Sequence, residues 1–207
     1  MGNKVYVWDT FVRIFHWSLV ALFVTSYVTG EEETILHIYS GYAILALVVA
    51  RILWGFIGSR YARFRDFVKG PREVMEYARS MASGKPKHYL GHNPLGGLMV
   101  LALLAALLMT TVSGLKLYAV EEGKGPLAST ISVSPIAQAY AHGEGSDHGK
   151  ERKEGEEFWE EIHEFSVNLM LLLIALHIGG VVVSSRLHRE SLVKAMVTGY
   201  KEENDAS

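Results

Sequence analysis

Two histidines on one long apolar segment are the residues of this chain best placed to do chemistry. His163 and His177 lie fourteen residues apart, and the segment 162–185 that carries them contains one charged residue, Glu164. On an α-helix this spacing advances about 21 Å and returns to within roughly 40° of the same face. Imidazole is a ligand of haem iron, and an ionisable group inside a membrane span is costly enough to indicate function. The pair therefore predicts axial ligands for two haems, one above the other in a bilayer.

The elements that must position these histidines are four apolar stretches. The chain of 207 residues is 49% hydrophobic, and its mean hydropathy of +0.17 is high for a soluble domain. The stretches cover about residues 11–29, 37–58, 94–114 and 160–185, and each is close to the roughly 20 residues that cross a bilayer as a helix. Helices of a soluble bundle would keep a polar stripe, and the third stretch has no charged residue.

These stretches predict an all-α fold, an integral membrane four-helix transmembrane bundle, with residues 1–207 as a single domain. Charged and apolar residues at helical spacing in 71–81 and near 192–196 predict short amphipathic interfacial helices, with solvated loops as the alternative. The connection 115–159 is expected to be an outer loop. Because the chain has no cysteine, disulfides, iron–sulfur clusters and thiolate or covalent haem attachment are excluded.

The basic residues set the expected orientation in the membrane. The connection 59–93 carries eight Lys and Arg residues, whereas the connection between the first two stretches carries three Glu and no Lys or Arg. The positive-inside rule then places 59–93 and both termini in the cytoplasm. We therefore expect a multi-pass protein of the bacterial inner membrane, with the loop 115–159 in the periplasm.

With this topology each histidine has a depth. His16 is five residues into the first stretch, about 7–8 Å from its cytoplasmic end, and His177 lies at a similar level in the fourth. His37 and His163 each open a stretch at the outer face. Depth therefore pairs His16 with His177 and His37 with His163. Two imidazoles on one iron leave no open coordination position, which suits electron transfer.

Two arginines are candidates to hold haem propionates. Arg51 lies fourteen residues after His37, so it shares that face and reaches the level of the inner haem. Its counter-charge could be a propionate, or its side chain could snorkel to the membrane surface. Arg13, three residues before His16, is the second candidate. His92 could line a quinone pocket or help to cap the third helix.

Two rival classes fit the residues less well. A di-iron carboxylate bundle needs a Glu-x-x-His motif from each of two helices, and Glu160–His163 is the single one among the four stretches. A haem-free transporter would not explain why the histidines pair by depth. We expect no nucleic-acid partner.

Five short pieces of the chain carry a family resemblance. They are Arg13-Ile-Phe-His16-Trp17, His37 followed by Gly41, Gly91-His-Asn-Pro-Leu-Gly96, Glu161-Ile-His163 with His177, and Met196-Val-Thr-Gly199-Tyr-Lys201. With these pieces the chain resembles, over essentially its whole length, the four-span di-haem cytochromes of the bacterial cytochrome b(561) group. That group includes the b-type cytochrome subunits of nickel–iron hydrogenases.

The resemblance implies a function and partners. In the family the four matching histidines ligate two haem b groups, and electrons pass between a periplasmic redox partner and membrane quinone. We therefore interpret the chain as a membrane-bound b-type cytochrome that relays electrons between a partner such as a hydrogenase subunit or a c-type cytochrome and the quinone pool. It has no catalytic side chains of its own in this interpretation, and whether it is also a quinone oxidoreductase stays open.

The alternative function is a self-contained superoxide- or quinone-reacting oxidoreductase that uses the outer haem directly. Acidic residues outnumber the lysines of the outer loop, which disfavours steering of an anion.

In the main interpretation we expect the protein partner to act at the His37/His163 haem and quinone at the His16/His177 haem. The third stretch carries no proposed ligand, so a homodimer packed through it is compatible with the sequence.

Overall fold

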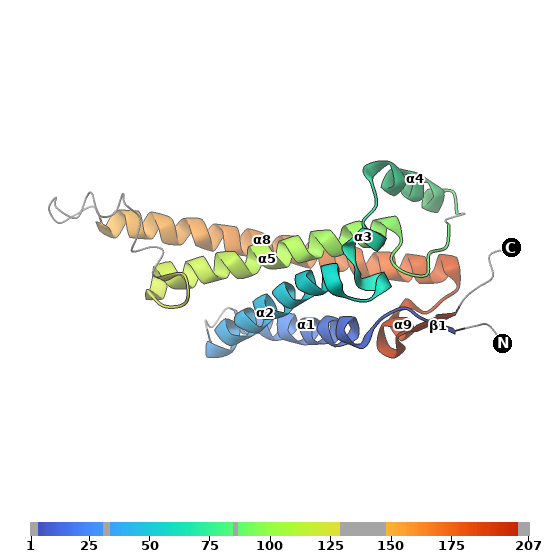
Figure 1. Ribbon diagram of the computed structural model, residues 1–207. Coiled ribbons are helices and arrows are strands. Elements are labelled where there is room, and N and C mark those ends of the chain that lie inside the picture. Colours follow the sequence, from blue (N-terminus) through green and yellow to red (C-terminus); the bar gives the residue numbers. More distant parts are fainter. Residues whose placement is uncertain (1–3, 31–33, 85–86, 129–147, 203–207) are drawn as a thin grey trace. The chain divides into compact units, whose positions relative to one another are not determined.

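Long helices dominate the computed structural model, which describes residues 4–30, 34–84, 87–128 and 148–202 (Figure 1). Four of them match the predicted apolar stretches: α1 (Thr10–Val28), α2 (Ile35–Ile57), α5 (Pro94–Glu122) and α8 (His148–His188). Each contains a segment long and apolar enough to cross a membrane. The predicted all-α, four-helix membrane fold is confirmed.

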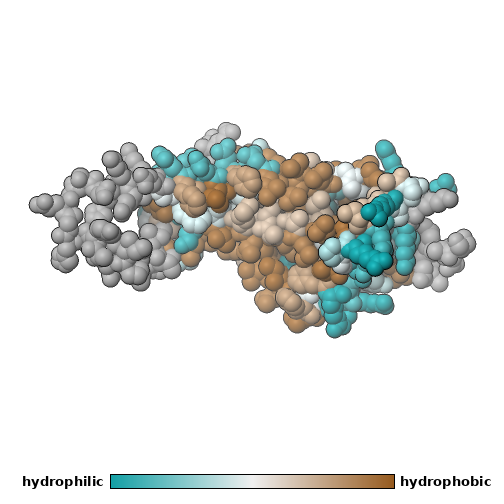
Figure 2. All heavy atoms as spheres, turned by 90° about the horizontal axis from the view of Figure 1, so that it is seen from above, coloured by the Kyte–Doolittle hydropathy of each residue, from teal (hydrophilic) through white to brown (hydrophobic). Residues whose placement is uncertain are grey.

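The apolar side chains of these helices largely face outward. Only 11–28% of each apolar window is buried within the protein, and Val28 and Ile57 are 71% and 77% exposed. Figure 2 shows hydrophobic residues covering much of the visible helical surface, with hydrophilic residues gathered away from them. Exposing such an area to water would cost about 25 cal/mol per Å². Lipid is therefore the environment that this surface requires.

Capping residues explain where several helices begin. The carboxylate of Asp9 accepts a hydrogen bond from the Val12 amide at 2.8 Å and caps α1. Asn93 caps α5 by accepting from the Gly96 amide at 2.7 Å, and Pro94 occupies the first helical position, where no backbone donor is needed. Ser191 caps α9 (Leu192–Thr198) through the Lys194 amide.

Two helices extend beyond the apolar stretches that predicted them. Helix α5 continues to Glu122 rather than ending at 114, and α8 begins at His148 rather than at 160. The predicted loop 115–159 is therefore helical at both of its ends, and residues 129–147 lie outside the described part. Hydropathy reports where lipid ends, whereas a helix continues as long as its residues favour it. His163 consequently lies inside α8 and not at its start.

The chain divides into two compact units, residues 1–104 with 172–207, and residues 105–171. In the first unit α1 packs beside α2 (Figure 1). It also holds η1 (Arg60–Ala62), α3 (Phe64–Phe67), α4 (Pro71–Ala82), α9, β1 (Lys4–Tyr6) and β2 (Tyr200–Glu202). In its described residues, the second unit contains the later part of α5 and the earlier part of α8. The short helices predicted at 71–81 and near 192–196 are present as α4 and α9.

A small sheet joins the two ends of the chain, which the sequence did not predict. Strands β1 and β2 pair antiparallel with Val5 opposite Lys201. The Lys201 ammonium is buried and lies 2.9 Å from a carboxylate oxygen of Glu190. It also donates to the Tyr89 carbonyl at 3.2 Å. These contacts hold the first and the last described strand together within the first unit.

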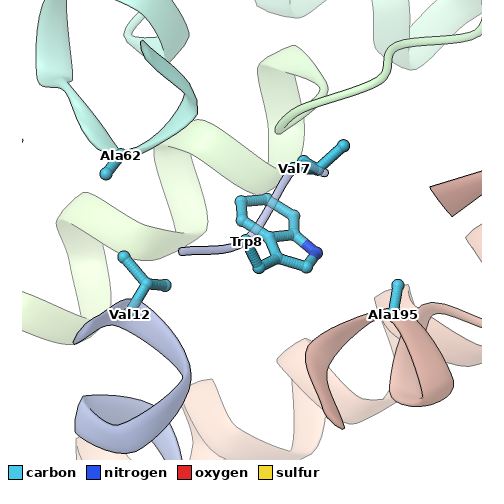
Figure 3. Close-up of a cluster of buried hydrophobic side chains, with 5 residues drawn as sticks. All are labelled: Val7, Trp8, Val12, Ala62 and Ala195. Carbon is cyan, nitrogen blue, oxygen red and sulfur yellow. The ribbon is translucent and has the colours of Figure 1, made fainter. Parts of the chain in front are cut away.

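A hydrophobic cluster underlies this sheet. It consists of the buried side chains of Val7, Trp8, Val12, Ala62 and Ala195, with Trp8 among the others (Figure 3). The cluster gathers the start of α1, the η1 turn and α9 around one indole ring. It provides this end of the first unit with a core that does not depend on lipid.

Asp9 joins the start of α1 to the end of α2, and its removal should destabilise the protein. The carboxylate accepts from the Trp54 indole at 3.1 Å and from the Ser59 hydroxyl as well as capping α1. Burial raises the pKa of the Asp9 carboxyl, but these hydrogen bonds and the charge of Arg51 outweigh burial, so the pKa lies below its ordinary value. The stabilisation is therefore present above the unfolded-state pKa and is lost as the pH falls through the folded-state pKa.

We predict that Asp9→Ala lowers the free energy of unfolding by at least the usual cost of a lost cap, about 0.5–2 kcal/mol. Asp9→Asn, which keeps an acceptor oxygen, should lose less. Thermal denaturation in detergent, followed by circular dichroism at pH 7, would measure both. A midpoint for Asp9→Ala equal to that of the wild type would contradict the role of this carboxylate.

Candidate functional site

His16 on α1 and His177 on α8 lie close together in the first unit. Their ring centres are 6.4 Å apart, and the ring planes are inclined by 51°. An imidazole nitrogen binds a metal at about 2.0–2.1 Å, so two imidazoles on opposite sides of one ion have ring centres roughly 6 Å apart. The separation therefore fits two axial ligands of one iron. The Nδ1 atom of His16 is buried and has no hydrogen-bond partner among the described residues.

His37, at the start of α2, is oriented by the end of α1. Its Nδ1 lies 2.8 Å from the backbone carbonyl oxygen of Ser26 and 3.3 Å from the Ser26 hydroxyl. A carbonyl oxygen can only accept, so Nδ1 carries the proton. The lone pair of the ring is then on Nε2, the nitrogen that a metal would use.

His163 is oriented in the same way within the second unit. Its Nδ1 lies 3.0 Å from the carbonyl oxygen of Thr110 and 3.1 Å from the hydroxyl of Ser113, both on α5. Its proton is again placed on Nδ1. His37 belongs to the first unit and His163 to the second.

Arg51 is buried in the first unit. Its side chain does not snorkel, since the residue is only 3% exposed. One guanidinium nitrogen, Nη2, donates to the Ala62 carbonyl at 3.1 Å, and the group lies 5.7 Å from the centre of the Phe64 ring. The other, Nη1, is buried without a hydrogen-bond partner among the described residues. This nitrogen is available to hold an anionic group.

Arg13 has a structural contact that the sequence did not suggest. Its Nη1 donates to the Val197 carbonyl at 2.7 Å, and its Nη2 donates to the Thr10 hydroxyl at 3.3 Å. The guanidinium therefore binds a carbonyl in the last turn of α9, where a positive charge is favourable. This contact ties α9 to α1.

His92 does not cap α5, because Asn93 does. The His92 ring packs between Trp8 and Phe67, with ring centres 4.6 Å and 4.7 Å away. Burial, together with the positive charges of Arg51 and Lys201, lowers the pKa of His92 to about 3. The ring is therefore neutral at physiological pH.

Comparison with known proteins decides the family. Residues 7–199 match the family model described as prokaryotic cytochrome b561. The chain belongs to this family. As a b-type cytochrome of the family it is a multi-pass membrane protein of electron transport, and it binds haem b.

The relatives of this cytochrome b561 are named for one kind of complex. It is 26% identical to the probable Ni/Fe-hydrogenase B-type cytochrome subunit of Azotobacter chroococcum mcd 1, over 96% of the chain and 89% of the relative. The subunit of the same name from Azotobacter vinelandii gives the same values. That of Rhizobium leguminosarum bv. viciae is 24% identical over 98% and 92%. No solved structure matches this cytochrome.

Several residues of the cytochrome around its histidines were not predicted from the sequence. They are the hydroxyl and carbonyl partners of the two oriented rings, Ser26, Thr110 and Ser113, together with Gly114. The sequence carries a signal for the two histidines but none for these partners, because a serine follows His37 and His163 at the third position, at Ser40 and Ser166. Both of these hydroxyls donate to the carbonyl of their histidine, at 2.9 Å and 2.7 Å. The helical turns that carry His37 and His163 therefore share the same serine hydrogen bond.

We predict that His92 makes the cytochrome sensitive to mild acid. Its pKa is lower in the folded than in the unfolded protein, so below about pH 6.5 the unfolded state binds the extra proton and gains stability. The denaturation midpoint should therefore fall more steeply from pH 7 to pH 5 in the wild type than in His92→Gln. A comparison at pH 8, where both side chains are neutral, corrects for packing. Parallel curves between pH 7 and pH 5 would refute the shift.

Proposed function

We propose that this cytochrome relays electrons across the bacterial inner membrane, between a periplasmic redox partner and the quinone pool, by means of two haem b groups. The observation that carries the proposal is the separation of 6.4 Å between the rings of His16 and His177. This distance suits two ligands of one iron, and it occurs between the two histidines that depth alone had paired.

The four histidines have defined roles in this proposal. His16 and His177 hold the inner haem, and His37 and His163 hold the outer one. Bound haem would supply one-electron redox chemistry, and the four histidines would hold its iron. The protein fixes the tautomer of the outer ligands through Ser26 and Thr110, and its apolar helices keep water from the ligands.

Arg51 is the proposed partner of an inner-haem propionate. It is a buried cation with one donor nitrogen still unused by the described residues, and a carboxylate would satisfy both its charge and its N–H group. Arg13 is a weaker candidate, because two of its nitrogens already bind Val197 and Thr10. A haem propionate near Arg13 would have to share these nitrogens or bind Nε, which is buried and has no partner among the described residues.

The orientation follows from the basic connection 59–93, which the positive-inside rule assigns to the cytoplasm. Both termini are then cytoplasmic, and the pairing of β1 with β2 supports their common side. The outer haem faces the periplasm in this arrangement. Quinone would react near the inner haem, close to Arg51 and the start of α5.

The relatives favour a nickel–iron hydrogenase as the periplasmic partner, because the curated proteins that match nearly the whole chain are named as hydrogenase cytochrome subunits. A c-type cytochrome remains the alternative partner. A self-contained oxidoreductase is the second candidate function, and turnover of purified cytochrome without any partner would distinguish it. A homodimer through α5 is compatible with either function, because α5 supplies no proposed ligand.

We predict two haems per chain that are lost in pairs. Wild-type protein should give two haem b per chain in a pyridine haemochromogen assay. His16→Ala and His177→Ala should each remove one haem or convert it to high spin, and both should affect the same spectral component. His37→Ala and His163→Ala should affect the other. The control His142→Ala should keep both haems, and a common component lost in His16→Ala and His37→Ala would refute the pairing.

We also predict that quinone acts at the inner haem. A quinone-analogue inhibitor should shift the absorption or midpoint potential of the component that depends on His16 and His177. An inhibitor shift confined to the other component, and retained in His16→Ala, would place the quinone site on the periplasmic side.

Purification in mild detergent from cells that make hydrogenase should recover its nickel-containing subunits with the cytochrome.

A further inference from the structure

We propose that Ser26 and Ser113 are positioning residues, which orient the two outer-haem ligands and set the potential of that haem. The inference rests on the proposed role of His37 and His163 as ligands. It concerns two small groups of residues. The Ser26 cradle consists of Ser26 and Gly30 around His37, and the Ser113 cradle consists of Thr110, Ser113 and Gly114 around His163.

The Ser26 cradle is formed where α1 ends. The Gly30 amide donates to the Tyr27 carbonyl at 3.4 Å. The Ser26 carbonyl therefore does not accept the amide hydrogen bond that residue i+4 would donate within a continuous α-helix. His37 donates to this carbonyl from Nδ1 at 2.8 Å. The Ser26 hydroxyl stands beside the same nitrogen at 3.3 Å. One residue therefore offers the ring two acceptors.

The Ser113 cradle gives His163 the same pair of acceptors from two residues. Nδ1 lies 3.0 Å from the Thr110 carbonyl and 3.1 Å from the Ser113 hydroxyl. The hydroxyl also donates to that carbonyl at 3.0 Å, which leaves its lone pairs for the imidazole N–H. Ser113 is 1% exposed, so its hydroxyl is held in place with little access to water.

A glycine follows each bound carbonyl by four residues, at Gly30 and Gly114. Gly114 lies on the same face of α5 as Thr110, because residues four apart share one face of a helix. Gly30 follows the end of α1, and a Cβ atom there would lie 3.4 Å from the Ser26 carbonyl oxygen. A Cβ atom at Gly114 would lie 2.9 Å from Cε1 of His163, whereas one at Gly30 would lie 3.5 Å from the His37 ring. The first contact is too short for any side chain, and the second is ordinary.

The two cradles occur in different units and on different helices, yet they share their chemistry. Each has a carbonyl, a hydroxyl and a glycine around Nδ1, and each histidine is followed by a serine that binds its own carbonyl. The inner ligand His16 has no such arrangement, because its Nδ1 lacks a partner among the described residues. The cradles therefore distinguish His37 and His163 from His16.

The cradles should affect redox properties as well as geometry. Donation of the Nδ1 proton to an acceptor makes the ligating nitrogen more basic. A more basic ligand favours ferric over ferrous iron and lowers the haem potential, since hydrogen bonding to axial ligands is one of the protein's controls on that potential. Loss of the hydroxyl acceptor weakens this effect and should raise the potential.

The test is a redox titration of purified cytochrome carrying Ser26→Ala or Ser113→Ala. Both variants should raise the midpoint potential of the same haem and leave the other haem unchanged. Ser40→Ala and Ser166→Ala are matched controls, because these hydroxyls bind the backbone of the histidines and not the rings, and they should leave both potentials unchanged. An unchanged or lowered potential in Ser26→Ala and Ser113→Ala would overturn the inference. Upward shifts of two different haems would support the cradles but refute the proposed pairing of His37 with His163.

Glycine variants test the geometry separately. Gly114→Ala should displace the His163 ring, so that one haem loses its low-spin electron paramagnetic resonance signal while the helical circular dichroism is retained. Gly30→Ala should keep both low-spin signals. Wild-type spectra and potentials in Gly114→Ala would overturn the Ser113 cradle.

Discussion

Hydrogen bonding of imidazole in an apolar span is the constraint on which the functional part of this protein depends. In lipid no water can satisfy a polar group, so each must find a partner inside the protein. A helix can offer a backbone carbonyl to a side chain in two places. One is its C-terminal end, where the carbonyl receives no backbone amide, and the other is a position where one carbonyl accepts two hydrogen bonds. His37 meets the first condition at the end of α1, and His163 meets the second on α5, where Ser113 also donates to the Thr110 carbonyl. These bonds settle the tautomer before any metal binds.

The sequence predicted the elements well because a bilayer imposes a length on them. Four apolar stretches became four helices, and the fixed rise per residue brought His16 and His177 to the same level. The helix ends were predicted less well. Helix α5 runs on to Glu122, and α8 starts at His148, because hydropathy detects lipid whereas helix propensity does not depend on it. The β1–β2 pair was missed, since strands of three residues carry almost no periodicity.

Contacts between helices were beyond prediction for a different reason. Depth depends on residue number, but which side chains meet also depends on how each helix is rotated about its axis. Arg51 shows the difference. Its level was predicted, whereas its bond to Ala62 and its place over Phe64 come from the turn that follows α2. The histidine-to-serine spacing at His37 and His163 was visible in the sequence, yet only the hydrogen bonds give the repeat a meaning.

The burial of the Arg51 guanidinium in the first unit has a high free-energy cost, and this cost favours a functional explanation. Taking a guanidinium out of water costs several kcal/mol unless charge and hydrogen bonds replace the water. Ala62 supplies one acceptor, Phe64 supplies a ring face, and Asp9 supplies a negative charge. Nη1 still has no partner among the described residues. A leucine would fill such a site at lower cost, whereas an anion at Nη1 would offset the cost of burying the guanidinium. The haem b propionate that we propose as the partner of Arg51 is such an anion.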